Sequence, residues 1–328
     1  MIAESYYQPT PTDIWTGRID GTDKEVLRWH QHIQAVHLLQ EPLPPLRRGQ
    51  KGIALLGFAC DEGVRRNKGR VGAAQGPAAL RRACADLPVH FAAGTLLIDA
   101  GDIVCNNRQL ETAQDALTEV VQQIVAGGYT PVLLGGGHEI TYGHARGIYS
   151  AFPTQTIGLV NFDAHFDLRM PNNQGATSGT GFMQLARDCY EQQKPFHYLA
   201  LGIQAHSNTQ QLFRVARELE VQEVPAAVFH MQDMPTLKAA VAGFLRRIDR
   251  FYLTIDLDVF AAPYAPGVSA AAYNGILPHG AFMECYRLLL QSGRLAGLDI
   301  AELNPGFDID NRTAKLAAAL LFEAVMNL

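Results

Sequence analysis

The chain has 328 residues, of which 48% are hydrophobic, and it carries a formal net charge of −5. Such a chain can bury a large core, and its acidic balance offers no basic field to attract nucleic acid or an anionic membrane. The start, MIAESYYQPT, lacks the pattern of a signal peptide. The longest apolar stretch, residues 316–326, is interrupted by Glu323 and falls short of the ~20 residues that span a bilayer. We therefore expect a soluble protein without nucleic-acid or membrane partners.

The cysteines are scattered along the chain, and no two of them form a CxxC pair. This distribution argues against a disulfide framework and against a zinc site built from thiolates, and it favours a reducing, cytoplasmic setting. The five cysteines are Cys60, Cys84, Cys105, Cys189 and Cys285.

The first fifty residues differ from the rest of the chain. Thr22-x-x-Glu25 matches a capping box, which predicts a helix that runs towards Leu39 and is ended by the prolines of residues 42–45. We interpret residues 1–50 as an N-terminal extension packed on the main domain.

From residue 52 onward, short apolar runs alternate with longer segments of helical period, a pattern typical of parallel strands joined by helices. It predicts a single α/β domain over residues 1–328, extension included, with a parallel sheet buried on both faces. We predict strands over residues 53–58, 96–99, 131–134, 156–162, 197–201, 251–255 and 298–300. Predicted helices include residues 77–85, 110–126, 235–247, 279–291 and 312–326, the second of them ended by Gly127-Gly128.

Three of the predicted strands are followed directly by polar residues that carry chemistry. Ligands of open α/β sheets gather beyond the carboxyl ends of the strands, and residues two apart in an extended chain point the same way. We therefore expect two imidazoles and four carboxylates to face one pocket. They are His138 after Gly135-Gly136-Gly137, then Asp163, His165 and Asp167, and finally Asp256 and Asp258.

Four carboxylates at buried strand ends repel one another unless protons or cations neutralise them. Two divalent cations cancel four aspartates, and a set of oxygen and imidazole ligands without thiolate suits Mn²⁺ better than structural zinc. A two-metal centre lowers the pKa of a bridging water and presents hydroxide to an electrophilic carbon. The pattern favours a metal-dependent hydrolase.

Each motif taken alone has a simpler interpretation. A single Asp-x-Asp is commonly a solvated strand end, His138 could cap the following helix, and the three glycines could form a phosphate-binding turn. The presence of all three motifs on three strand ends favours the metal site.

Four segments resemble the signature motifs of the ureohydrolase superfamily, which includes arginase, agmatinase and formimidoylglutamase. They are GGGHE at 135–139, NFDAHFDLR at 161–169, TIDLDVF at 254–260 and DIAELNP at 299–305. The resemblance implies a three-layer α/β/α fold and a dinuclear manganese site. Its six ligands would be His138, Asp163, His165, Asp167, Asp256 and Asp258. The resemblance also implies that Glu302 faces the cationic group of the substrate.

The loop after the second motif distinguishes members of this superfamily. Arginases and agmatinases carry a histidine shortly after a Ser-Gly pair, whereas this chain has SGTGF at 178–182 without one. That loop, DEGVRRNKGR at 61–70 and WTGRID at 15–20 resemble formimidoylglutamase. Gly181 departs from the SGTPF form usual there, a change that loosens the loop without removing a functional group.

The substrate of that enzyme, N-formimidoyl-L-glutamate, carries two carboxylates and a formamidinium group. Arg65 and Arg70 flank Asn67 in a loop after the first predicted strand of the main domain, where guanidinium groups could clamp carboxylates. Ser178 and Thr180 could add hydroxyl donors. The alternative is a solvated basic loop that balances nearby acids.

The resulting hypothesis is metal-dependent hydrolysis of formimidoylglutamate to L-glutamate and formamide by a metal-bridging hydroxide, a step of histidine degradation. Glu302 would hold the amidinium, and Asp167 would carry a proton to the leaving amine. Two alternatives stay open, an amidinohydrolase that releases urea from agmatine, arginine or a guanidino acid, and a non-catalytic subunit of the same fold. Homo-oligomers are possible, and the sequence does not specify their size.

Overall fold

The computed structural model describes residues 4–92 and 94–328, and its centre is a ten-stranded sheet. The strands run in the order β1-β4-β3-β5-β10-β9-β6-β7-β8, with β2 also paired to β4. All pairs are parallel except β1 with β4. The strands are β1 Tyr7–Gln8, β2 Gln34–Ala35, β3 Lys51–Ala59, β4 Thr95–Val104, β5 Tyr129–Leu134, β6 Ile157–Phe162, β7 His197–Ile203, β8 Gln222–Pro225, β9 Arg250–Asp256 and β10 Leu295–Ala301.

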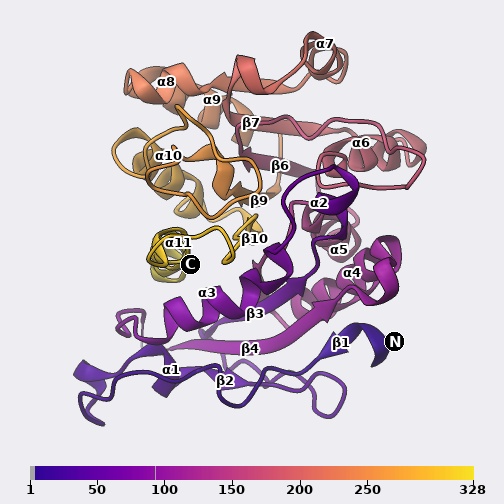
Figure 1. The fold of residues 1–328 in the computed structure, drawn as a ribbon. Coiled ribbons are helices and arrows are strands. Elements are labelled where there is room, and N and C mark those ends of the chain that lie inside the picture. Colours follow the sequence, from indigo (N-terminus) through magenta and orange to yellow (C-terminus); the bar gives the residue numbers. More distant parts are fainter. Residues whose placement is uncertain (1–3, 93) are drawn as a thin grey trace.

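Helices cover both faces of the sheet (Figure 1). One hydrophobic cluster lies between the sheet and α3, α8, α9, α10 and α11, and a second lies between the sheet and α4, α5, α6 and α7. The helices are α1 Trp29–His32, α2 Glu62–Arg66, α3 Gly76–Ala85, α4 Leu110–Ala126, α5 Ile140–Ala151, α6 Gly181–Glu191, α7 Gln210–Glu218, α8 Ala226–His230, α9 Met234–Leu245, α10 Ala281–Leu290 and α11 Arg312–Asn327.

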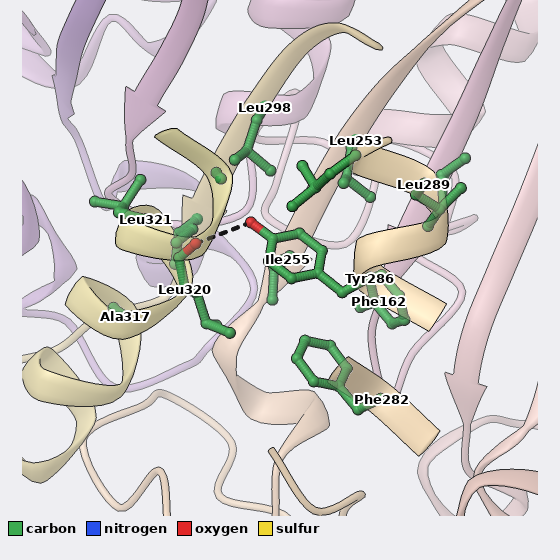
Figure 2. Packing of buried hydrophobic residues seen from close by; sticks show 14 of the residues in the cluster. Phe162, Leu253, Ile255, Phe282, Tyr286, Leu289, Leu298, Ala317, Leu320 and Leu321 are labelled. Atoms are coloured by element: carbon green, nitrogen blue, oxygen red, sulfur yellow. Dashed lines mark hydrogen bonds between the residues drawn. The ribbon is translucent and has the colours of Figure 1, made fainter. Parts of the chain in front are cut away.

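The packing of the first cluster is visible where α10 and α11 meet the sheet (Figure 2). Tyr286 of α10 is fully buried there, and its hydroxyl donates a hydrogen bond to the carbonyl of Leu320 on α11 at 3.1 Å. The central strands are buried along their whole length, β6 and β10 included, because helices cover both faces. Their residues therefore form continuous apolar runs without the alternation of a half-exposed strand.

The seven predicted strands are confirmed, and so is the parallel sheet covered on both faces. The predicted helices of the main domain correspond to α3, α4, α9, α10 and α11 within a few residues. The predicted stop of α4 is also confirmed, since Gly127 caps it and Gly128 takes a positive φ of 83°. Such a backbone conformation suits glycine, which has no Cβ.

The predicted helix from Thr22 to Leu39 is wrong. This segment holds a short 3₁₀ turn, Lys24–Val26, the four-residue α1 and the strand β2. Its backbone pairs instead with the segment after α3: Trp29 donates to the carbonyl of Leu87, and Val89 donates to that of Leu27. The burial of Trp29 and these tertiary hydrogen bonds outweigh the local capping signal.

No helix in residues 4–92 and 94–328 is long and apolar enough to cross a membrane.

Candidate metal centre

The predicted ligands lie at the carboxyl ends of β5, β6 and β9. At this point of the sheet, strands that are neighbours in space are not neighbours in the sequence. Strands β5 and β6 follow one another in the sequence, but β10 and β9 lie between them in the sheet. Ligands of open α/β sheets bind in crevices at such crossover points.

The three glycines after β5 bring the chain close to two neighbouring strands. Gly135 donates to the carbonyl of Ile300 at 2.8 Å, and Gly137 donates to that of Cys60 at 2.8 Å. A Cβ on Gly136 would lie 2.0 Å from the Cys60 oxygen. Any side chain there would collide with the backbone. The glycines therefore let the loop lie directly against the neighbouring strands, which fixes the position of the next residue, His138.

The structure brings all six predicted ligands together in two groups. Within each group, one nitrogen or oxygen of every residue lies within 4.8 Å of the others. One group is His138, Asp163, Asp167 and Asp256, and the other is Asp163, His165 and Asp258. Asp163 belongs to both, so a pair of cations bound here would share its carboxylate.

The first group surrounds one ring nitrogen of His138. Nδ1 of His138 lies 2.8 Å from Asp167 Oδ2 and 3.2 Å from one oxygen each of Asp163 and Asp256. The amide of Asn161, on the preceding strand β6, donates to Asp163 Oδ2 at 3.0 Å and holds this carboxylate in place. Asp167 has a positive φ of 49°, which an aspartate adopts at some energetic cost.

In the second group, Nδ1 of His165 lies 3.3 Å from Asp163 Oδ1 and 3.2 Å from Asp258 Oδ2. Two of the aspartates are oriented by the chain that follows them: Asp163 accepts from the backbone N–H of His165, and Asp256 accepts from that of Asp258. The Oδ1 atom of Asp258 is buried without a hydrogen-bond partner in the described part of the chain. A cation would satisfy that oxygen.

Without cations, the cluster has to hold protons. Burial raises the pKa of Asp258 to about 6 against the opposing effect of His165, and burial together with Asp258 and Asp163 raises that of Asp256 well above its usual value. Burial alone would lower the pKa values of both histidines, but hydrogen bonds and charges from the aspartates outweigh it and raise them. The donor set and this demand for positive charge both fit a pair of divalent cations.

Two buried glutamates lie beside the cluster. Glu302 follows β10 with a positive φ of 69°; its Oε1 accepts from the backbone N–H of His138 at 2.8 Å, and Oε2 has no partner among the described residues. Glu139 accepts from the backbone N–H of Gly63 at 2.7 Å and so ties α2 to the loop that follows β5. Burial raises the pKa of Glu302 to about 8, with Glu139 adding to the shift, and raises that of Glu139 to about 7.

These shifts predict how pH affects the metal-free protein. Carboxyls with raised pKa values hold more protons in the folded than in the unfolded state. The free energy of unfolding should therefore fall as the pH rises from about 4 and passes the pKa values of these groups, about 6 at Asp258, 7 at Glu139 and 8 at Glu302. The raised pKa values of His138 and His165 act in the same direction. Urea unfolding in EDTA between pH 5 and 8 measures this.

Added Mn²⁺ should reverse much of that loss, because cations replace the protons and bind more tightly as the ligands deprotonate. The pKa of Asp163 is lowered, so this group makes the free energy of unfolding rise with pH instead. That rise takes place at pH values below the usual pKa of an aspartate, outside the interval measured by urea unfolding. A metal-free protein whose unfolding midpoint stayed constant or rose over this interval would contradict the predicted cluster.

A pocket of about 330 Å³ opens above the cluster. Three of the five residues predicted for the substrate, apart from Glu302, line it: Asn67, Arg70 and Ser178. Asn67 donates to the hydroxyl of Ser178 at 3.2 Å. The guanidinium of Arg70 donates to the carbonyls of Val268 and Ser269 and lies over the ring of Phe307.

The other two lie elsewhere. Arg65 pairs with Glu62 through two hydrogen bonds of 2.6 Å and borders a separate surface hollow. The Glu62-x-x-Arg65 spacing in a short helix is a sequence signal for such a pair. Thr180 is fully buried, and its hydroxyl contacts Thr177 in its own loop and Gln184 in α6.

Arg169 is a pocket residue that the sequence reasoning did not single out. It is exposed, lines the pocket, and has no ion-pair partner in residues 4–92 and 94–328. Its backbone N–H donates to the carbonyl of Gly179, which joins the segment after β6 to the SGTGF loop. Its place two residues after Asp167 was the available signal, because neighbours of a metal ligand commonly reach the same pocket.

The sequence profile of the Arginase family matches residues 51–327. This chain belongs to the arginase family. One member of the arginase family, the formimidoylglutamase of Chromobacterium violaceum, is 46% identical over 318 residues, which cover 96% of this chain and 98% of that protein. The formimidoylglutamase of Clostridium tetani is 38% identical, and the match covers 97% of this chain and 95% of that protein.

Solved structures of the arginase family have the same fold. The crystal structure of formimidoylglutamase from Bacillus subtilis superposes with a TM-score of 0.81 at 23% identity, covering 94% of this chain and 95% of that one. A Trypanosoma cruzi formiminoglutamase with Mn²⁺₂ superposes with a TM-score of 0.75 at 25% identity, covering 89% and 98%. The family resemblance and the three-layer fold predicted from the four motifs are confirmed.

Proposed function

We propose that this arginase-family protein hydrolyses N-formimidoyl-L-glutamate to L-glutamate and formamide with two Mn²⁺ ions, as a step of histidine degradation. Relatives named formimidoylglutamase, matched over nearly the whole chain, support this substrate. The related structure with Mn²⁺₂ supports the metal. The proposed ligands are the six side chains of the two groups described above, with Asp163 shared.

One observation carries the choice of substrate: the pocket has charges of both signs. Its floor holds the cluster and Glu302, and its wall carries the side chains of Lys68, Arg70 and Arg169. A molecule with a cationic amidine at one end and two carboxylates at the other is complementary to such a pocket. Agmatine has no carboxylate and arginine has one, so urea-releasing hydrolysis of these is the weaker candidate.

The chemistry follows from the positions of these groups. The six ligand side chains would hold two Mn²⁺ ions, which would supply hydroxide near neutral pH by lowering the pKa of a bound water. Glu302 uses Oε1 to accept from His138, which leaves Oε2 to accept from the amidinium and orient its carbon towards the cluster. Asp167, a partly exposed carboxylate lining the pocket, would carry a proton to the leaving amine.

The side chains of the pocket wall would bind the carboxylates. The guanidinium of Arg169 has no ion-pair partner among the described residues and could make a bidentate contact, whereas that of Arg70 already donates to two carbonyls. Asn67 and Ser178 would add neutral donors. Thr180 would act through the shape of the loop, and Arg65 would reach the substrate only if it left Glu62.

The first test is an assay of the purified protein with Mn²⁺. We expect formamide release from formimidoylglutamate and little urea from arginine, agmatine or guanidino acids. Urea release at a higher kcat/KM than formamide release would refute the proposed substrate.

Arginine variants test the carboxylate contacts. Replacing Arg169 with methionine should lower kcat/KM for formimidoylglutamate about ten- to a hundredfold, since a hydrogen bond to a charged group contributes about 1.5–3 kcal/mol. The loss should appear mainly in KM if the contact is equal in the ground and transition states. Arg65→Met is the matched variant outside the pocket and should stay near the parent.

Substrates lacking one carboxylate provide the control for this prediction. They should be poor for the parent enzyme and nearly insensitive to Arg169→Met when the missing group is the one Arg169 binds. An equal loss on full and trimmed substrates would assign Arg169 to the loop structure instead.

The location of the protein in the cytoplasm is part of the same proposal. All five cysteines are free, Cys105 being partly buried and the other four buried, which supports a reducing compartment.

A further inference from the structure

A chain of buried side chains continues from His138 into the interior, on the side of the ring that faces away from the cluster. Nε2 of His138 lies 3.0 Å from the hydroxyl of Thr254, and that hydroxyl donates to Oδ1 of Asp299 at 2.5 Å. The other oxygen of Asp299 accepts from the hydroxyl of Tyr252 at 2.7 Å and lies 2.6 Å from Nδ1 of His144. All five side chains are buried.

The pairing of β9 with β10 brings these side chains together. Thr254 on β9 lies directly beside Asp299 on β10, and Tyr252 points to the same face of β9 two residues earlier. His144 reaches them from α5, the helix that follows the segment holding His138. Gly297 gives it room, since a Cβ on Gly297 would lie 2.6 Å from His144 Nε2.

Donors and acceptors can be assigned to this row of side chains in only one consistent way. Asp299 is an acceptor for three groups, so the single hydroxyl proton of Thr254 is committed to it. The oxygen of Thr254 can then only accept from His138, which requires the proton of the neutral imidazole on Nε2. Nδ1 is left with its lone pair, and this is the nitrogen that faces Asp163, Asp167 and Asp256.

We propose that Thr254 and Asp299 are positioning residues, which hold His138 in the tautomer and orientation that present Nδ1 to a metal ion. The outer donors Tyr252 and His144 hold the Asp299 carboxylate in place. Partners that orient a metal-binding histidine typically contribute 10- to 100-fold to metal affinity. This inference rests on the proposed role of His138 as a ligand, and it adds four residues that do not line the pocket.

The decisive variant is Thr254→Val, which keeps the shape of the side chain and removes the hydroxyl. It should bind one of the two Mn²⁺ ions about 10- to 100-fold more weakly and leave the other ion near its parental affinity, because His165 and Asp258 are untouched. Thr254→Ser restores the hydroxyl and should bind both ions like the parent. The readout is a Mn²⁺ titration of the apoprotein, with free Mn²⁺ followed by electron paramagnetic resonance.

Asp299→Asn should have a larger effect than Thr254→Val. Two donors, Tyr252 and His144, face one side of residue 299, so an asparagine there turns its carbonyl to them and its NH₂ towards Thr254. The Thr254 oxygen then accepts a hydrogen bond from this NH₂ group, so its own hydroxyl proton must be donated to His138 Nε2. That reversal places the ring proton on Nδ1, the nitrogen needed for the metal.

A second pair of variants separates this effect from a general loss of stability. Tyr252→Phe removes an outer donor to Asp299 and should weaken binding at the same site by less than Thr254→Val. Tyr286→Phe removes an equally buried phenol hydroxyl, which donates to the carbonyl of Leu320 on α11 and not to Asp299, and should leave both Mn²⁺ affinities unchanged (Figure 2). Unfolding midpoints of the metal-free variants show whether each protein is folded.

Parental affinity for both ions in folded Thr254→Val and Asp299→Asn would overturn the inference, and so would a Thr254→Ser variant as weak as Thr254→Val. His138→Ala distinguishes this failure from failure of the proposed metal site. If His138→Ala keeps both ions at parental affinity, the ligand assignment itself is wrong. If it loses one ion while the Thr254 and Asp299 variants bind normally, only the positioning role is wrong.

Discussion

Replacing Asp163 with alanine should remove both manganese ions, whereas replacing Asp258 should remove only one. The reason is geometric, because each oxygen of Asp163 faces a different histidine. Its Oδ2 lies 3.2 Å from the Nδ1 of His138 and its Oδ1 lies 3.3 Å from the Nδ1 of His165, so this carboxylate belongs to both groups. Asp258 belongs to the second group, where its Oδ2 lies 3.2 Å from the Nδ1 of His165, and it is not part of the first. Elemental analysis after dialysis against low Mn²⁺ gives the stoichiometry of each variant.

Activity should fall at least a hundredfold in both variants, since losing a direct ligand costs more than losing a residue that orients one. The metal-free variants should remain folded, because each substitution removes one of four mutually repelling carboxylates. Asp115→Ala, at an exposed carboxylate paired with Arg146, is the matched control and should retain both ions. Full occupancy in Asp163→Ala would show that this cluster is not the metal site.

Glu302→Gln should abolish most activity while both ions stay bound. The glutamine carbonyl can still accept from the backbone N–H of His138, as Glu302 Oε1 does. Its NH₂ group then faces the pocket where the amidinium must bind. Both the NH₂ group and the amidinium are hydrogen-bond donors, so they cannot bind each other. Losing a charge-assisted contact and gaining this mismatch should lower kcat/KM on the order of 10²- to 10³-fold.

The measurement pairs kinetics with metal content, since only a substrate role leaves occupancy unchanged. Glu284→Gln, at a half-exposed glutamate paired with Lys238, controls for the loss of one negative charge. Unchanged kinetics in Glu302→Gln would show that this side chain does not contact the cation of the substrate.

The metal ligands could be placed from the sequence because their arrangement depends on local geometry. Residues two apart at a strand end share a direction, and parallel strands bring their carboxyl ends to one edge. Asp163, His165, Asp256 and Asp258 need little more than these rules. The strands were equally predictable, since burial on both faces leaves continuous apolar runs.

The pocket wall and the N-terminal segment depend on contacts between distant parts of the chain. Whether Arg65 or Arg169 faces the pocket is decided by Glu62 and by the backbone pairing of residues 169 and 179. Trp29 is buried because α3 and the segment after it lie beside it. Pattern rules for single elements do not contain this information, so a local capping signal there predicted the wrong structure.

The left-handed backbone at Asp167 and Glu302 has an evolutionary consequence. Glycine or asparagine would adopt those conformations at lower energy, and glycine would also relieve the burial of a carboxylate. Mutation at either position can therefore make the protein more stable and less able to work. A lineage that no longer needed the reaction would therefore be expected to drift towards such residues first, trading the chemistry of the site for stability.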